Sequence, residues 1–241
     1  MKITNYIWSL IAVSCICFTS CDKKLAPQIE EFPISGFHSI DIKHFMNVVL
    51  EQDTSFYIET SGSKKFTSEL NFDVVDSILY ISNDKSFTWL NPKKKLLTVT
   101  IHAPDFREIS IHKSCHLTNI DTLRLNELIL NFTGKQASAE LSMHADVFAF
   151  WNNNPNGGQI DLSGTCDHLK AWAYALINIE AQQLETREAT ILHSTRGFIN
   201  INASEKLRYS IQNEGELNVY GSPANIEILE PNTGTGNLII H

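Results

Sequence analysis

One short pattern returns four times in the second half of the chain and constrains the fold more than any other feature. Each copy is an apolar, a polar and an apolar residue, which in an extended strand points the outer two side chains inward and the middle one to water. The copies begin at Ile160, Ile177, Ile199 and Leu217, so successive steps are 17, 22 and 18 residues. This spacing is typical of strands that stack in a repeating structure.

A second series of alternating residues lies between these triplets. It begins at Leu169, Ala189 and Leu207, with steps of 20 and 18 residues. Two independent series with one period indicate a solenoid, in which each repeat contributes one rung. We therefore predict an all-β fold, a parallel β-helix or β-solenoid with about 20 residues per rung. In such a register, Ile179 lies inside the core between Leu162 and Ile201.

The first half of the chain is also dense in strand-forming residues. Strands at this density are compatible with a sandwich or a barrel as well, but tight hairpin turns are scarce, and Asn156-Gly157-Gly158 is the one candidate. Because a solenoid exposes unpaired strands at both ends, we expect the early strands to cap one end and the final segment the other. The expected early strands are 37–42, 47–50, 56–60, 72–81, 96–101 and 107–111.

The amino terminus has the features of an export signal. Lys2 precedes an apolar stretch, Tyr6 to Phe18, that is too short to span a bilayer. The sequence Phe18-Thr19-Ser20-Cys21 resembles a bacterial lipobox, although leucine is usual where Phe18 stands. We predict a lipoprotein signal peptide over residues 1–20, lipidation of Cys21 and a polar tether over 21–35. The alternative is a plain signal peptide that is cleaved elsewhere in this region.

Charge and cysteine content narrow the choice of partners. The formal net charge of −8 disfavours nucleic acid, which needs a basic surface. We expect the membrane to be reached through the lipid on Cys21, which places the protein in the cell envelope. Cys115 and Cys166 are 51 residues apart, or two to three rungs, which is too far for a disulfide, so we predict two free thiols.

The most regular polar feature is the outward row of the repeat. Stacked rungs lie about 4.8 Å apart, which lets polar side chains hydrogen-bond from rung to rung. This row favours a structural ladder, and a ligand-binding face for a polar sugar is the alternative. The candidate residues are Asp161, Asn178, Glu180, Asn200 and Asn218.

No pattern in the chain predicts a metal, a cofactor or a catalytic residue. His112, Cys115 and His116 have metal-binding side chains, but on one strand Cys115 points away from the two histidines. Thr233-Gly234-Thr235-Gly236 lacks the lysine and the helix of a phosphate loop. Polysaccharide lyases and hydrolases need gathered carboxylates, and the triplets place a single acid, Asp161, on the ladder.

Residues 36–241 resemble the putative auto-transporter adhesin, head GIN domain family. The likeness is carried by Gly36-Phe37-x-x-Ile40, by 162–169 (LSGTCDHL), by 219–223 (VYGSP) and by 233–236 (TGTG). In two rungs the small Gly-Ser-Gly turns of the family are replaced, by Lys113-Ser114-Cys115 and Asn213-Glu214-Gly215. The resemblance implies a right-handed parallel β-helix in an exported protein, and it transfers no catalytic residue.

These observations favour a cell-envelope lipoprotein whose solenoid is a non-enzymatic adhesion, binding or scaffold module. Its expected ligand is a polysaccharide or a surface protein. The alternative is a polysaccharide lyase or hydrolase built on a pectinase-like β-helix.

Overall fold

The computed structural model describes residues 28–62, 67–83, 97–152 and 154–241, and the predicted lipidation site, Cys21, lies outside them. This part of the chain is nearly all β. The early strands are β1 (Gln28–Pro33), β2 (Ser39–Ile42), β3 (Met46–Gln52), β4 (Tyr57–Gly62), β5 (Asn71–Val75), β6 (Ile78–Ser82), β7 (Thr98–Ala103), β8 (Glu108–Ile111) and β9 (Cys115–Asn119). The later strands are β10 (Leu123–Phe132), β11 (Gln136–Trp151), β12 (Gly157–Thr195), β13 (Ile199–Ile211), β14 (Leu217–Val219), β15 (Asn225–Ile228) and β16 (Leu238–Ile240).

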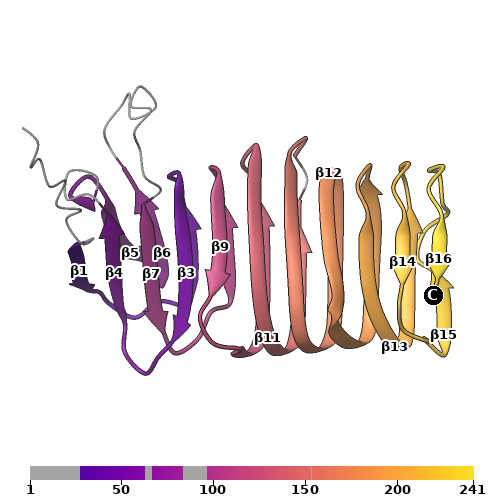
Figure 1. Ribbon diagram of the computed structural model, residues 1–241, viewed down its shortest axis with the longest axis horizontal. Coiled ribbons are helices and arrows are strands. Elements are labelled where there is room, and N and C mark those ends of the chain that lie inside the picture. The colour runs from indigo at the N-terminus through magenta and orange to yellow at the C-terminus, as the bar shows by residue number, and fades with distance from the viewer. Residues whose placement is uncertain (1–27, 63–66, 84–96, 153) are drawn as a thin grey trace, which may run out of the picture.

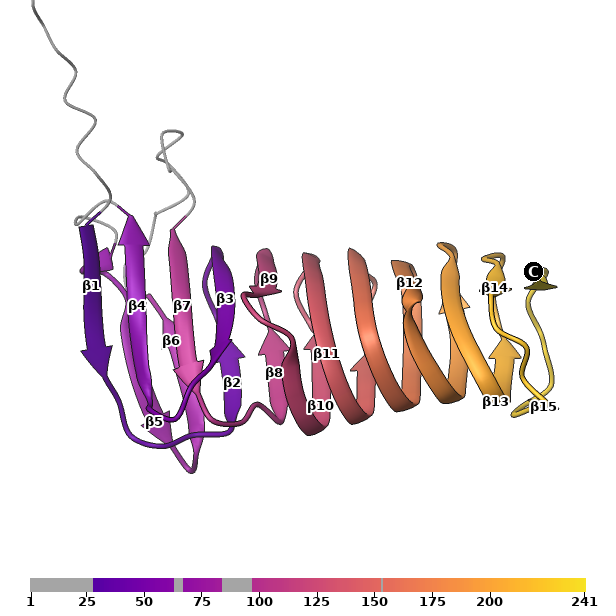
Figure 2. The ribbon, with the colours of Figure 1, turned by 60° about the horizontal axis from the view of Figure 1, so that its bottom comes forward.

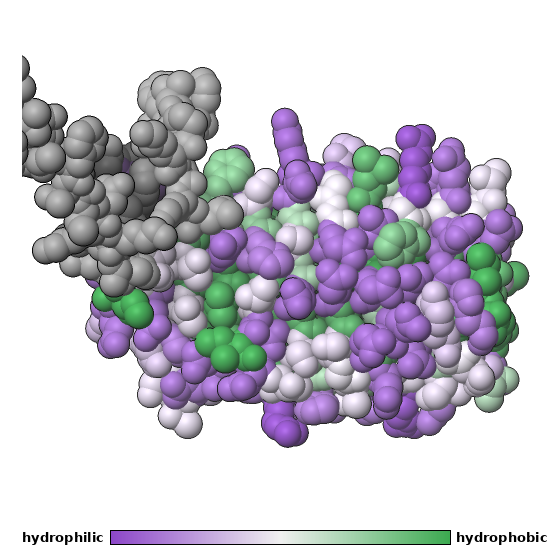
Figure 3. Space-filling model, in the orientation of Figure 1, coloured by the Kyte–Doolittle hydropathy of each residue, from purple (hydrophilic) through white to green (hydrophobic). Residues whose placement is uncertain are grey.

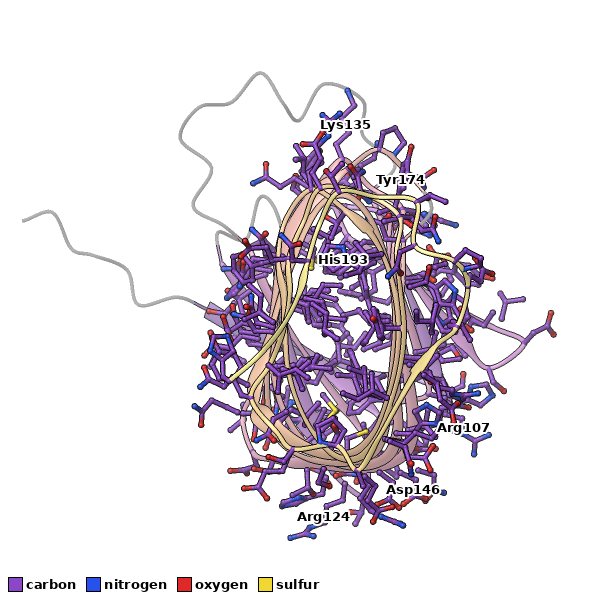
Figure 4. The ribbon with its side chains drawn as sticks, turned by 90° about the vertical axis from the view of Figure 1, so that its right-hand side faces the viewer. Arg107, Arg124, Lys135, Asp146, Tyr174 and His193 are labelled. Carbon is purple, nitrogen blue, oxygen red and sulfur yellow. The ribbon has the colours of Figure 1, made fainter. Side chains whose placement is uncertain are left out.

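The strands wind into a solenoid of about six turns with a spacing of about 21 residues, which confirms the predicted parallel β-helix (Figure 1). Seen from its end, the solenoid is a flattened oval with two long sides (Figure 4). One side, which we call sheet 1, contains β1, β4, β7, β3, β9, β14 and β16. The other, sheet 2, contains β5, β6, β2, β8 and β15. The long strands β10 to β13 bend around the narrow end of the oval and join the two sheets.

The core fills the oval with side chains that alternate inward and outward. All eight apolar residues of the four triplets are buried, and the middle residue of each is partly exposed. The second series is buried in the same way, with Ala189 beside Leu207 and Ile191 beside Tyr209. Alternation along the sequence therefore gave the correct inner and outer faces.

The register of one rung differs from the prediction. Ile179, rather than Ile177, lies beside Ile199, and Glu180 lies beside Asn200. A shift of two residues keeps every side chain on its predicted face, so the apolar pattern could not distinguish the two registers. The register is fixed where the chain turns into this rung, at Thr195. The Thr195 hydroxyl accepts a hydrogen bond from the Ile177 amide at 3.0 Å and donates one to the Ile177 carbonyl at 2.9 Å.

The early strands cap one end, as expected, and they do so with antiparallel pairs. β4 pairs antiparallel with both β1 and β7, and β5 pairs antiparallel with β6. The predicted single strand 72–81 is instead a hairpin, because Asp76 and Ser77 both have positive φ, 51° and 62°, and form its two-residue turn.

Near this cap the rungs do not follow the order of the sequence. β3 lies between β7 and β9, and β2 lies between β6 and β8 (Figure 2). The chain therefore makes one rung with β2 and β3, moves outward to build the cap, and returns past that rung to begin β8.

The opposite end of the solenoid is open, so the expectation that the final segment caps it is wrong. β15 and β16 add as parallel strands, with Ile228 beside Tyr209 and Ile240 beside Val219. These side chains continue the buried columns of the core, but they are 61% and 53% exposed. Figure 3 shows the hydrophobic surface that results at this end.

Candidate functional site

A ladder of polar side chains runs along the outside of sheet 1. Asn200 donates from Nδ2 to Glu180 Oε2 at 2.7 Å, and Asn218 donates from Nδ2 to Asn200 Oδ1 at 2.9 Å. His241 Nε2 lies 3.2 Å from Asn218 Oδ1, which continues the row to the last rung. Three of the predicted face residues, Glu180, Asn200 and Asn218, are thus brought together.

The same row continues through acidic residues toward the amino terminus. Glu140 lies beside Asp161 in the register of β11 and β12. The Leu176 amide donates to the Asn156 carbonyl at 3.1 Å, and extending this parallel register places Asp161 beside Glu180. Asp161 is therefore not the only acid on the ladder, because Glu140 and Glu180 flank it. The triplet pattern missed Glu140 because this residue belongs to a rung outside the four copies.

Asn178 stands apart from the ladder because of the two-residue shift in register. Its Oδ1 accepts a hydrogen bond from the Phe198 amide at 3.2 Å, which anchors the turn that leads into the next rung. Asn178 also lines a groove of about 730 Å³ in sheet 1, near the narrow end of the oval where Lys135 lies (Figure 4). Gly157 and Gly158 form part of the groove, where the absence of side chains hollows the surface. Other polar lining residues are Asn47, Ser114, His116, Lys135, Gln136, Ser138 and Gln159.

His112, Cys115 and His116 do not converge. His112 Nε2 lies 3.1 Å from Asp41 Oδ2, whereas His116 Nδ1 lies 2.8 Å from the Ser138 hydroxyl. Cys115 points into the core and is buried. Within the described ranges, no group of three histidine, cysteine or acidic side chains is arranged to hold a metal ion.

Cys115 and Cys166 are free, as predicted, and the structure shows that both are buried. Burial raises the pKa of the Cys115 thiol to about 12 and that of the Cys166 thiol to about 11. A thiol reacts as its thiolate, so neither side chain is poised as a nucleophile near neutral pH. Both act as small core residues.

Together, the stacked rungs, the polar outer ladder and the buried thiols define a β-solenoid that presents extended polar surfaces. The chain belongs to the family described as putative auto-transporter adhesin, head GIN domain, whose model matches residues 36–223.

Three solved structures share the fold. A putative adhesin from Bacteroides fragilis is 21% identical with a TM-score of 0.77, covering 89% of this chain and 97% of its own. A putative adhesin from Parabacteroides merdae is 16% identical with a TM-score of 0.62, covering 90% and 97%. A putative lipid binding protein from Parabacteroides distasonis is 15% identical with a TM-score of 0.60, covering 90% and 98%.

The search of curated proteins gave no match. In the part of the chain that the structure describes, no helix has the length and apolar character needed to cross a membrane.

Proposed function

We propose that this chain is a non-enzymatic adhesion or binding module, exported and held at the cell envelope by a lipid on Cys21. Its family carries the name of an adhesin, and its amino terminus has the apolar stretch and the cysteine of a lipoprotein signal. The proposed ligand is a polysaccharide or a surface protein, bound along sheet 1.

The observation that carries the proposal is the ladder of Glu180, Asn200 and Asn218. Each asparagine amide has two N–H donors and uses one of them within the ladder. The two asparagines are partly exposed, which leaves their second N–H donors available to a ligand, whereas the second carboxylate oxygen of Glu180 is buried. Neighbouring rungs repeat these groups about every 4.8 Å, an arrangement that suits the hydroxyl groups of a sugar chain.

The test is binding of the purified protein to arrays of immobilised polysaccharides and surface proteins. The variant Glu180→Gln/Asn200→Ala/Asn218→Ala should lose about tenfold or more in affinity, which corresponds to a few lost hydrogen bonds. Sheet 2 offers a matched control, because Asn131 Nδ2 donates to Glu108 Oε1 at 2.8 Å in the same kind of pair. Glu108→Gln/Asn131→Ala should bind normally. Equal binding by both variants would contradict the proposed face.

A polysaccharide-acting enzyme is the second candidate, and the row of Glu140, Asp161 and Glu180 is what favours it. Neighbouring carboxylates can act as acid and base in glycoside chemistry. The assay is the release of reducing or unsaturated ends from a panel of polysaccharides. If the wild-type protein cleaves a polymer and Glu180→Gln abolishes cleavage with the fold intact, the enzyme replaces the binding module.

A further inference from the structure

A second surface, on the upper ridge of the oval, has a chemistry different from that of sheet 1. We define the ridge site by Lys135, Tyr174, Leu176 and Arg196. Tyr174 and Leu176, two positions apart, are 44% and 61% exposed, which brings two large side chains together on the surface. Figure 4 shows Lys135 and Tyr174 projecting from the same narrow end of the oval.

The backbone is held in a strained turn that presents both apolar side chains. Ala175 has φ of 63°, a left-handed conformation that favours glycine. Tyr174 and Leu176 lie on either side of this turn and, two residues apart, both point outward. The Ala175 carbonyl accepts a hydrogen bond from the Arg196 amide at 2.8 Å, which fixes the turn. Strain that the surrounding structure maintains in this way is frequent at functional sites.

Two cations border the exposed apolar side chains. Lys135 and Arg196 line a hollow of about 490 Å³ together with Tyr174 and Leu176, and none of the described residues that line it carries a carboxylate. Both side chains are exposed, and neither forms an ion pair with a described residue. In a chain with a net charge of −8, two cations in a hollow whose described lining residues include no carboxylate mark a place for an anion.

Backbone hydrogen bonds between rungs show how many rungs separate Lys135 from Arg196. The Gly157 amide donates to Lys135, the Leu176 amide to Asn156 and the Arg196 amide to Ala175, so Lys135 and Arg196 are three rungs apart. At the rung spacing of a β-helix, their backbones are separated by about 14 Å. An extended ligand whose negative charges repeat along its length suits two cations that project from separate rungs.

An aromatic surface continues from the ridge onto sheet 2. Trp172 faces outward two residues before Tyr174, and its ring stacks on that of Trp151 at 3.9 Å between centroids and 11° between planes. Flat, electron-rich rings favour the C–H face of a sugar ring, whereas an acidic peptide gains little from them. Carboxylates on the same polymer would accept charge-assisted hydrogen bonds from Lys135 and Arg196.

We propose that the ridge site binds an acidic polysaccharide, a polymer of uronate type, through Tyr174 and the two cations. This proposal rests on the binding role proposed above, but it uses a surface separate from the sheet 1 ladder. Variants of the two surfaces can therefore fail independently.

The experiment measures migration of the protein in native gels that contain sodium polygalacturonate, with dextran as the neutral polymer and poly-L-glutamate as the acidic peptide. The wild-type protein should be retarded by polygalacturonate alone, and less so as salt is added. Lys135→Gln/Arg196→Gln and Tyr174→Ala should each weaken binding about tenfold, the loss of one or two charge-assisted contacts or of one stacked ring.

Arg124→Gln is the matched control, because Arg124 is an exposed cation at the opposite narrow end of the oval (Figure 4). It should bind polygalacturonate like the wild type. Equal retardation by poly-L-glutamate, or loss of binding in Arg124→Gln, would show general charge attraction and overturn the proposal. No retardation of the wild type by polygalacturonate would overturn it too. Loss of binding to an array ligand in the sheet 1 variant alone would leave the ridge result unaffected.

Discussion

Glu180 lies beside Asn200 in the neighbouring rung and accepts a hydrogen bond of 2.7 Å from its amide. This contact lies on the outer face of the rung, whereas the neighbouring pair of Ile179 and Ile199 lies in the core. The inner and outer members of one rung should therefore respond very differently to mutation.

We expect Ile179→Asp to destabilise the fold by several kcal/mol, because it buries a charge without a partner in an aliphatic column. Asn200→Ala should cost about 1 kcal/mol, since it removes a partly exposed hydrogen bond. Urea denaturation followed by circular dichroism measures both. Equal losses would mean that the two faces are assigned wrongly.

A buried histidine should make stability depend on pH. Burial lowers the pKa of His193, whose ring lies in the core with Nε2 at 3.0 Å from the Glu216 carbonyl. The unfolded chain binds a proton on this residue below its ordinary pKa of 6.5, while the folded chain resists it. The free energy of unfolding should therefore fall as the pH drops below about 6.5.

The variant His193→Gln keeps a donor for Glu216 but cannot titrate. Its loss of stability between pH 7.5 and pH 5 should be smaller than that of the wild type. His168 is half-buried and its pKa is also lowered by burial, so some dependence should remain. His241→Gln, at an exposed position, is the control and should follow the wild-type curve. An unchanged curve for His193→Gln would refute the assignment.

The two core thiols should not react with a thiol reagent in the native protein. Their raised pKa values, about 12 for Cys115 and about 11 for Cys166, leave almost no thiolate at pH 8. In a chain that starts at residue 21 and carries Cys21→Ser, a thiol reagent should count none before denaturation. It should count two after denaturation without reductant. A count of zero in the denatured sample would reveal a disulfide.

Lipidation of Cys21 remains a prediction that mass spectrometry can check. The membrane fraction should contain a chain that begins at acylated Cys21, and Cys21→Ala should release the protein from that fraction. A mature chain in the soluble fraction that starts at another residue would rule out the lipid anchor.

The sequence predicted the solenoid because its signal is periodic and local. Apolar residues such as Ile160 and Leu162 recur at the spacing of a rung, and their alternation identifies the core. Most of the early strands were predicted from the same alternation, but β1 and β9 were not, and the turn at Asp76 and Ser77 was missed. Neither residue is a glycine, so the sequence did not indicate that their φ values are positive.

The parts that could not be predicted depend on contacts between rungs. The shift that separates Asn178 from Asn200 is fixed by Thr195, a corner residue outside the repeated triplets. Glu140 is the acidic neighbour of Asp161 because of the register between β11 and β12, which the triplet pattern does not specify. The ridge site is similar, because Lys135 and Arg196 are 61 positions apart in the sequence.

The displaced rung near the cap has a consequence for the order of synthesis. β2 and β3 leave the ribosome early, but their neighbours on the two sides are β6 and β7 and then β8 and β9. This rung is enclosed only after residue 119 has been made, whereas each later rung can add to the one just completed. Growth of the solenoid should therefore begin with a delay of about half the chain and then advance one turn at a time.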